Sequence, residues 1–501
     1  MEGTKRTGIL ANHIRLFSCV PCLSWFNSDP CRPLSEALHS SASSSSDRSK
    51  VVALHAIRFK SILLMVVLAE ALLASGCATH GDKLESIRSA FNAGRVEQAE
   101  SIVQREIAAR KSEADVLKLD RAIIQLADGR PADAERTLRE VRDRFDYLEQ
   151  KDAGESVLAT LTDDTKLAYA GEDYEKILIR CFLALSNLMA DGQDASAYAL
   201  QVGDKQRQII NAEGDSSKDN PRLAYKRVAL GAYLHGAIQE ATHTNYDEAA
   251  RAIQLVANWE PSFKDAGDDL KRVSTGRHSE PGNGVLYVFT LVGRGPYKVE
   301  RAETPTSTAL LIADRILTAT SKYSLPPTIA PIKVPVVVRS DNRIDSILVE
   351  TDTGAAGVTK TITDVGQLAV DQYDAIFPEV MARAVVRRVV KKGAIYATKD
   401  AANINDPLAS FALDAAGVLW EASESADTRC WGLLPDRIQV LRLELPAGEH
   451  VVKLKPASRN APIGTAASHT IGIEDGRNTY LMANFPEDRL VGQILVSNGP
   501  M

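Results

Sequence analysis

The sequence predicts an α+β multidomain protein, in which an all-α helical repeat array precedes a mixed α/β domain with a largely antiparallel sheet. Apolar residues recur at helical spacing over about residues 82–275, and the pattern changes to strand alternation over 280–501. One long amphipathic helix, at 371–399, interrupts these strands. A chain of 501 residues, 45% of them apolar, is long enough for several such domains.

Residues 58–77 have the three parts of a secretory signal: a short basic start, an apolar run, and small residues before Cys77. The apolar run is shorter than the roughly 20 residues that a membrane span needs, and Glu70 interrupts it. The ending Ala74-Ser75-Gly76-Cys77 resembles the lipobox of bacterial lipoproteins, although Ala74 replaces the usual leucine. The resemblance implies a signal peptide over 51–77 and a lipid on Cys77, which would hold the mature chain on a membrane. An ordinary cleaved signal is the alternative.

Residues 1–50 show no helical or strand period and contain a serine-rich stretch, so we interpret them as a gene-model extension or a disordered segment. Cys19 and Cys22 have metal-ligand spacing, but no second ligand pair stands nearby. Ala78 follows Cys77, and a residue other than aspartate there resembles the sorting signal for the outer membrane, facing the periplasm. The net charge of −6 is spread along the chain, so no nucleic-acid partner is expected.

The predicted helical array repeats one turn signature, a glycine five positions before an alanine. The pairs are Gly94 and Ala99, Gly129 and Ala134, and Gly192 and Ala197. Glycine provides a left-handed helix cap, and alanine lets the next helix pack closely. The first two glycines are 35 positions apart, and this spacing resembles that of tetratricopeptide repeats. The resemblance implies a concave face that holds a peptide or protein, or that the rest of the chain fills.

Tyr174 and Glu175 are candidate binding residues in an aromatic and acidic stretch, 167–177. They line a groove or, in the favoured interpretation, they begin a helix that has Asp173 at its cap. Cys181 lies in the apolar run that follows and is expected to be a buried hydrophobic residue.

Asp427, Arg429 and Trp431 are the second candidate binding cluster, between a predicted helix at 408–422 and a strand that starts at residue 438. An Asp–Arg pair beside Trp binds a ligand or, in the favoured interpretation, forms a salt bridge that fixes a domain corner.

In the C-terminal domain, residues 285–291 and 297–300 flank a Gly-Pro turn and predict a hairpin. Further strands are predicted at 333–339, 344–351, 358–363, 438–445, 450–455, 468–473 and 479–484. The helix at 371–399 has Pro378 near its first turn and a basic side that includes Arg383, Arg387, Arg388, Lys391 and Lys392. This helix lies on an anionic membrane or, in the favoured interpretation, packs on its own sheet.

The triplet Asp352-Thr353-Gly354 resembles the catalytic triplet of aspartic proteases, which use two such carboxylates. The chain has no second triplet, so a hairpin turn is the favoured interpretation. The usual zinc, nucleophile-elbow and phosphate-loop motifs are missing. We therefore predict no catalytic residue, metal or cofactor, and we expect that the protein is not an enzyme.

Several segments resemble a family of uncharacterised bacterial lipoproteins with N-terminal tetratricopeptide-like repeats and a C-terminal α/β domain. They are residues 169–175, 293–300, 383–392, 424–435 and 445–450. The resemblance implies an envelope lipoprotein that acts as a protein-binding or scaffolding module, with a protein or peptide partner on the repeat domain. A regulator of a cell-wall synthase and a hydrolase with a non-motif active site, with Asp352 as its candidate, are the alternatives.

Overall fold

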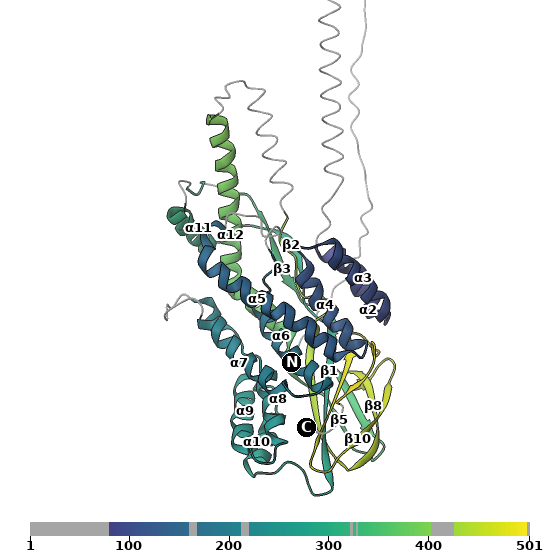
Figure 1. Ribbon diagram of the computed structural model, residues 1–501. Helices are drawn as coiled ribbons and strands as arrows, with labels where there is room; N and C mark the ends of the chain where they lie inside the picture. The colour runs from purple at the N-terminus through teal and green to yellow at the C-terminus, as the bar shows by residue number, and fades with distance from the viewer. Residues whose placement is uncertain are drawn as a thin grey trace, which may run out of the picture. The chain divides into compact units, whose positions relative to one another are not determined.

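The computed structural model describes residues 80–159, 168–211, 220–320, 324–326, 329–401 and 425–497. The chain divides between Gly76 and Cys77 into two units, and all described residues belong to the second. That unit is mixed α+β, as predicted, with helices first and mostly antiparallel strands after them (Figure 1). Cys77, the signal at 51–77, the segment 1–50 and the helix predicted at 408–422 lie outside the described residues.

The N-terminal α-helices pack in chain order, each against the next, whereas the short 3₁₀ helix Pro221–Ala224 packs mainly against the later helix α12 (Val365–Ala401) (Figure 1). They are α2 (His80–Asn92), α3 (Val96–Ala109), α4 (Ala114–Ala127), α5 (Pro131–Ala159), α6 (Asp173–Ala190), α7 (Ala195–Asn211), the 3₁₀ helix η2 (Pro221–Ala224), α8 (Leu230–Glu240), α9 (Tyr246–Trp259) and α10 (Asp265–Ser274). This order fits a helical array, and its likeness to tetratricopeptide repeats stays a prediction.

The repeated glycines end helices as predicted. Gly94, Gly129 and Gly192 have φ of 75°, 78° and 73°, which is the left-handed region that favours glycine. Ala99 and Ala134 are fully buried, but Ala197 is exposed, so the alanine prediction is wrong in the third unit. The reason is helical phase, because the buried side of α7 carries positions 195, 198, 199 and 202.

Two sheets make up most of the C-terminal part. The first has the order β12-β11-β1-β7-β6, and the second has the order β10-β8-β4-β5 with β9 beside β8. The strands are β1 (Asn283–Arg294), β4 (Ser346–Thr351), β5 (Ala356–Val358), β6 (Lys360–Asp364), β7 (Pro435–Pro446), β8 (Gly448–Ser458), β9 (Ala461–Pro462), β10 (Ala467–Ile473), β11 (Asn478–Phe485) and β12 (Leu495–Val496). Among the described pairs, β1 and β11 are parallel and the others are antiparallel.

The predicted strands are present at closely similar positions, but the predicted hairpin is wrong. Strand β2 (Tyr297–Glu303) pairs with β3 (Ile332–Val338) in a separate two-stranded sheet. Strand β1 lies at the centre of the first sheet, where β7 and β11 occupy both of its edges. No edge of β1 is left for β2, and the chain leaves the sheet at Gly295, whose N–H donates to Leu434 O.

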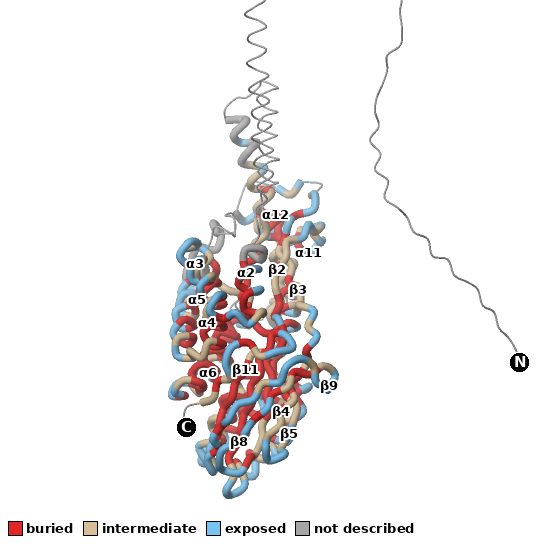
Figure 2. Tube along the Cα trace, turned by 90° about the vertical axis from the view of Figure 1, so that its right-hand side faces the viewer, coloured by how far each residue is buried: buried red, intermediate tan, exposed pale blue. Residues whose placement is uncertain are grey.

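The first sheet lies between the helices and the second sheet. Tyr287 and Phe289 of β1 belong to the same core as the helices, whereas Leu286 and Val288 point into the core shared with β4, β8 and β10. Such alternation follows from the two-residue period of a strand, and strand β1 is buried along almost its whole length. The helices and the sheet therefore share one continuous core, in which buried segments run through the middle of the unit (Figure 2).

A third, smaller core joins α11 (Ser307–Thr320), α12 (Val365–Ala401) and β3. Helix α12 thus packs on its own sheet, as the favoured interpretation has it. Helix α12 begins before the predicted residue 371. The Asp364 side chain caps the start of this helix, because it accepts a hydrogen bond from the backbone N–H of Gln367 at 2.9 Å. Pro378 therefore lies well inside the helix, and its predicted position near the first turn is wrong. No helix in the described ranges has the length and apolarity that crossing a membrane requires.

Candidate functional site

The two predicted residue clusters meet in the structure. The backbone N–H of Trp431 donates to the Glu175 carboxylate at 2.6 Å, across 256 positions of sequence. The Trp431 ring packs against Phe182 of α6, with ring centroids 5.3 Å apart. The Arg429 guanidinium lies over the ring of Tyr169 at 5.2 Å. The segment that leads into β7 is therefore held against the start of α6.

Glu175 is the centre of this contact and is fully buried. Its carboxylate also accepts from Tyr169 Oη at 2.6 Å, from Tyr174 Oη at 3.3 Å and from Glu172 N at 3.1 Å. Burial, and then the nearby Glu172, raise the pKa of Glu175. The helix start is where the sequence predicts it, but its cap is Glu172, in a capping box with Glu175, and not Asp173.

Asp427 and Arg429, two positions apart in the sequence, form a bidentate ion pair. Arg429 Nε donates to Asp427 Oδ1 at 2.8 Å, and Arg429 Nη2 donates to Oδ2 at 2.6 Å. Burial alone would raise the pKa of Asp427, but the hydrogen bonds and charge of Arg429 outweigh it and lower the pKa. The Arg429 guanidinium also donates to the carbonyl oxygen of Ser112. The pair therefore fits the salt-bridge interpretation, in which Asp427 and Arg429 fix a domain corner against the helices.

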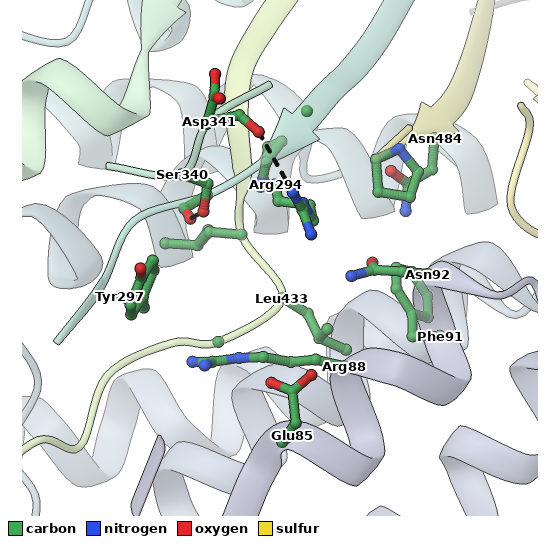
Figure 3. Close-up of a pocket in the computed structure, with 16 residues that line it drawn as sticks. Glu85, Arg88, Phe91, Asn92, Arg294, Tyr297, Ser340, Asp341, Leu433 and Asn484 are labelled. Carbon is green, nitrogen blue, oxygen red and sulfur yellow. Dashed lines mark hydrogen bonds between the residues drawn. The ribbon is translucent and has the colours of Figure 1, made fainter. Parts of the chain in front are cut away.

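A cavity of about 460 Å³ lies beside these residues, and sequence reasoning missed it (Figure 3). It is enclosed by α2, the end of β1 with the turn after it, the segment 340–341, the segment 432–435, and the end of β11. Its lining includes Glu85, Arg88, Phe91, Asn92, Arg294, Tyr297, Ser340, Asp341, Leu433 and Asn484. A volume of this size is in the usual range of small-molecule sites.

Arg88 is the most unusual residue of this cavity. Its Nε atom is buried and has no hydrogen-bond partner among the described residues, and its Nη2 atom lies 3.9 Å from Cys430 Sγ. A β-carbon on Gly432 would lie 2.9 Å from both Nε and Nη2 of Arg88, so the arginine passes directly over a residue that lacks a side chain. The guanidinium is thus positioned by close packing, with few polar partners of its own.

Asp120 of α4 lies behind Arg88 and is fully buried. Its Oδ1 atom accepts from Leu433 N at 2.7 Å, while Oδ2 has no partner in the described part of the chain. Burial raises the pKa of Asp120 to about 7, and the nearby charge of Arg88 opposes this shift. At neutral pH the carboxyl is therefore only partly ionised, and it compensates only part of the Arg88 charge.

Arg294 stands at the opposite rim. Its Nη2 atom donates to Asp341 O at 3.3 Å, and its backbone N–H donates to the Asn342 side chain at 2.8 Å. In Figure 3 the Arg294 guanidinium and the Asn92 amide point toward the middle of the cavity from opposite sides. The cavity therefore presents two cations and a donor-rich amide to a bound molecule.

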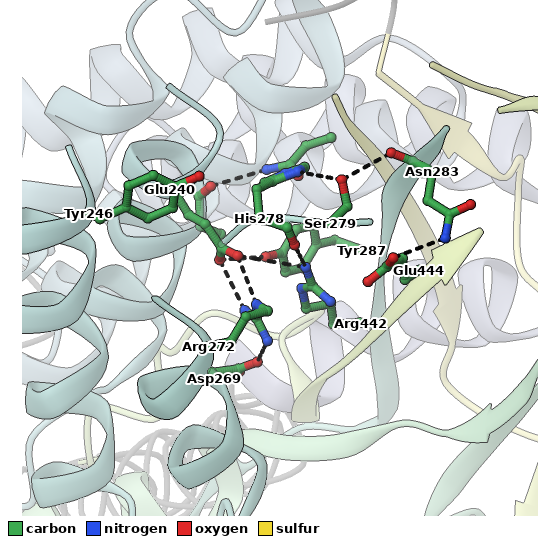
Figure 4. Close-up of polar contacts among 12 residues, drawn as sticks. Glu240, Tyr246, Asp269, Arg272, His278, Ser279, Asn283, Tyr287, Arg442 and Glu444 are labelled. Atoms are coloured by element: carbon green, nitrogen blue, oxygen red, sulfur yellow. Dashed lines mark hydrogen bonds and ion pairs between the residues drawn. The ribbon is translucent and has the colours of Figure 1, made fainter. Parts of the chain in front are cut away.

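A second buried polar cluster joins α8, α10 and the first sheet (Figure 4). Glu240 accepts from Arg272 Nε at 2.8 Å and from Arg272 Nη2 at 3.0 Å, and Arg272 also donates to Asp269 at 2.5 Å. The Nε2 atom of His278 lies 2.8 Å from Asn478 Oδ1, and burial lowers the pKa of His278. These groups satisfy one another at the contact between helices and sheet, so we assign them a structural role.

Asp352 lies in the tight turn between β4 and β5, where Gly354 has φ of 83°. The prediction of a hairpin turn is confirmed. The Oδ1 atom of Asp352 lies 3.2 Å from His450 Nδ1, but His450 Nε2 lies 2.7 Å from the carbonyl oxygen of Pro446. Both imidazole nitrogens of His450 therefore have a polar partner within the described chain.

Cys181 is fully buried in α6, as the apolar run predicts, and Cys430 is buried beside Arg88. Within the described ranges, no group of His, Cys, Asp and Glu side chains is placed to hold a metal ion.

No family model, curated protein or solved structure matches this chain.

Proposed function

We propose that this chain is a lipid-anchored binding protein of the bacterial envelope, in which Cys77 carries the lipid and the folded part binds a partner. The observation that carries the proposal is the lipobox-like end of the apolar segment, Ala74-Ser75-Gly76-Cys77, a short distance before the first described helix. Ala78, which follows Cys77 where a residue other than aspartate resembles the outer-membrane sorting signal, supports a location in the outer membrane, facing the periplasm.

The cavity is close in sequence to the proposed anchor. Arg88 follows Cys77 by 11 positions, and a fully extended chain of that length spans at most about 40 Å. A ligand in the cavity would therefore be held near the membrane surface. This proximity supports a protein that presents a binding site at the bilayer.

The outer helices offer a surface for a protein partner. Helix α6 is buried on nearly every side, whereas α7 and α9 are buried on one side only. Large exposed apolar side chains stand on α5, α7 and α9, namely Tyr147, Leu200 and Leu255. Because the first sheet covers the inner side of the helices, we place the protein or peptide partner on this outer side. A scaffolding role without catalysis fits this arrangement.

Metabolic labelling with an alkyne-bearing fatty acid tests the anchor in a bacterial host. We expect that the full chain takes up the label and stays in the membrane fraction, and that a Cys77→Ser variant does neither. An unlabelled wild-type protein, or a mature N-terminus at Met1 by mass spectrometry, would overturn the proposal.

Photo-crosslinking in cells tests the partner surface. A photoreactive residue at position 200, on α7, should give a discrete crosslinked product. The same residue at position 451, on the exposed side of β8, serves as the matched control because Val451 is also an exposed apolar side chain. Equal products from both positions would contradict a partner on the helices.

A further inference from the structure

We propose that the cavity beside α2 binds the carboxylate of a peptide-like ligand through Arg88. This inference rests on the proposed function, because it assumes that the protein binds a partner. It adds the chemical class of one ligand. It is independent of the lipid on Cys77.

The described chain neutralises the charge of Arg88 only in part. Its Nε atom is buried without a partner, and no ion pair joins its guanidinium to any carboxylate among the described residues. A half-buried cation with unused donors is costly unless a partner neutralises it. Arginine is also the side chain whose flat fork of N–H groups best matches a carboxylate.

The immediate neighbours of Arg88 do not remove this need. Asp120 lies close enough for the charge of Arg88 to act on its pKa, but it forms no ion pair with the guanidinium, and its own Oδ2 atom lacks a partner. Glu85 stands one turn earlier on α2 and also lines the cavity beside Arg88 (Figure 3), but its carboxylate forms no ion pair with the guanidinium. Space for the missing anion is therefore on the cavity side.

The remaining lining favours a peptide over a phosphate. Asn92 and Asn484 offer amide groups that both donate and accept, which are the partners that peptide N–H and C=O groups need. Phe91 and Leu433 add apolar surface for a small side chain. Two acidic residues, Glu85 and Asp341, share the lining and disfavour a doubly charged anion. A single carboxylate on a short peptide, held by Arg88, adds less negative charge to this lining than a phosphate would.

The backbone around Arg88 is built for close approach. At Gly432 a β-carbon would collide with the guanidinium, and at Gly295 it would lie 2.4 Å from Leu434 O. These two positions accept only glycine without movement of their neighbours. They hold the segment 432–435 and the turn after β1 close enough to α2 to close the cavity.

Binding of matched peptide mixtures tests the inference. The full chain, purified in mild detergent, is titrated with a mixture of N-acetylated tripeptides that have free carboxylates, and with the same mixture as C-terminal amides. We expect saturable binding of the free acids, detected by calorimetry or by a rise in melting temperature, and binding at least about tenfold weaker for the amides.

Two variants show whether Arg88 is responsible. Arg88→Met removes the charge at similar length and should weaken acid binding about tenfold or more. Arg105→Met, on the exposed side of α3, is the matched control and should leave binding unchanged. Gly432→Ala should weaken binding too, because it displaces Arg88 without removing its charge.

Three outcomes would overturn the inference: no binding of either mixture by a folded wild-type protein, equal binding of acids and amides, or full binding by a folded Arg88→Met variant. The Cys77→Ser variant separates this inference from the proposed anchor, because it should lose the lipid and keep acid binding.

Discussion

The Glu175 carboxylate accepts a hydrogen bond from the backbone N–H of Trp431 at 2.6 Å. Glu175 is the third residue of α6, and Trp431 stands in the segment before β7, so one buried contact joins the helices to the sheet. Because the carboxylate is fully buried, water cannot replace a lost partner. This contact therefore couples the stability of the two predicted domains.

Replacing Glu175 should destabilise the protein strongly. Glu175→Ala leaves the Trp431 N–H and the Tyr169 hydroxyl without their acceptor, and we expect a loss of about 3 kcal/mol of unfolding free energy. Glu175→Gln keeps one acceptor oxygen and should lose less. Denaturant unfolding measures both losses. Glu97→Ala, on the exposed side of α3, is the control and should change the unfolding free energy by at most about 0.5 kcal/mol. Equal losses for Ala and Gln would show that the acceptor is not what matters.

The strands were predictable because side-chain alternation is a local property of the sequence. Strand β1 was predicted at 285–291, and alternation could not tell which strands pair with it. Its partners, β7 and β11, come much later in the chain, and pairing with them is decided by packing of the whole sheet. The hairpin prediction failed for this reason, because it assumed that neighbours in sequence are neighbours in the sheet.

The candidate residues could be predicted one cluster at a time, but their contact could not. Local composition singled out Glu175 and Trp431, and no sequence pattern links positions so far apart. Arg88 was missed because a lone arginine on an amphipathic helix looks like part of a solvated face. Its significance appears only when folding brings Gly432 and Asp120 against it.

The pH dependence of stability should reveal Asp120. Burial raises its pKa to about 7 from an ordinary value of 3.8. Between these values the folded state keeps a proton that the unfolded state loses, so stability falls as the pH rises through this window. The full effect is on the order of 4 kcal/mol.

Asp120→Asn cannot ionise, so it should lack this part of the pH dependence. Calorimetric melting temperatures at about pH 5 and about pH 8 should fall more for the wild type than for the variant. Glu175 and Asp269, whose pKa values are also raised by burial, remain in both proteins. Parallel melting-temperature curves would mean that Asp120 is ionised throughout in the folded state.

Substitutions at two glycines with open surroundings measure the effect of backbone conformation on stability without steric crowding. Gly94 has φ of 75° and nothing within 4 Å of an added β-carbon, so Gly94→Ala should cost about 1 kcal/mol through backbone strain alone. Gly267 lies inside α10 with equally open space and no positive φ, so Gly267→Ala should stabilise by about 0.5–1 kcal/mol. Thermal unfolding measures both. A change of the same sign in the two variants would contradict the cap geometry.

Replacing Arg272 should destabilise the contact between the helices and the first sheet, because this contact contains buried charges. Arg272 is the main partner of Glu240 and Asp269, which are 1% and 5% exposed. Arg272→Met leaves both carboxylates buried with Arg442, whose Nη2 atom is 3.6 Å from Glu240, as the remaining cation. We expect a loss of about 3–5 kcal/mol, because an uncompensated buried charge costs more than the pair itself contributes.

A second substitution identifies the cause of that loss. Adding Glu240→Gln to Arg272→Met removes one of the uncompensated charges, so the double variant should be more stable than the single one in denaturant unfolding. Arg251→Met is the matched control, since Arg251 pairs only at the surface with Glu248 and is worth about 0–0.5 kcal/mol. If the double variant is less stable than Arg272→Met alone, the packing of the arginine, and not its charge, holds this contact together.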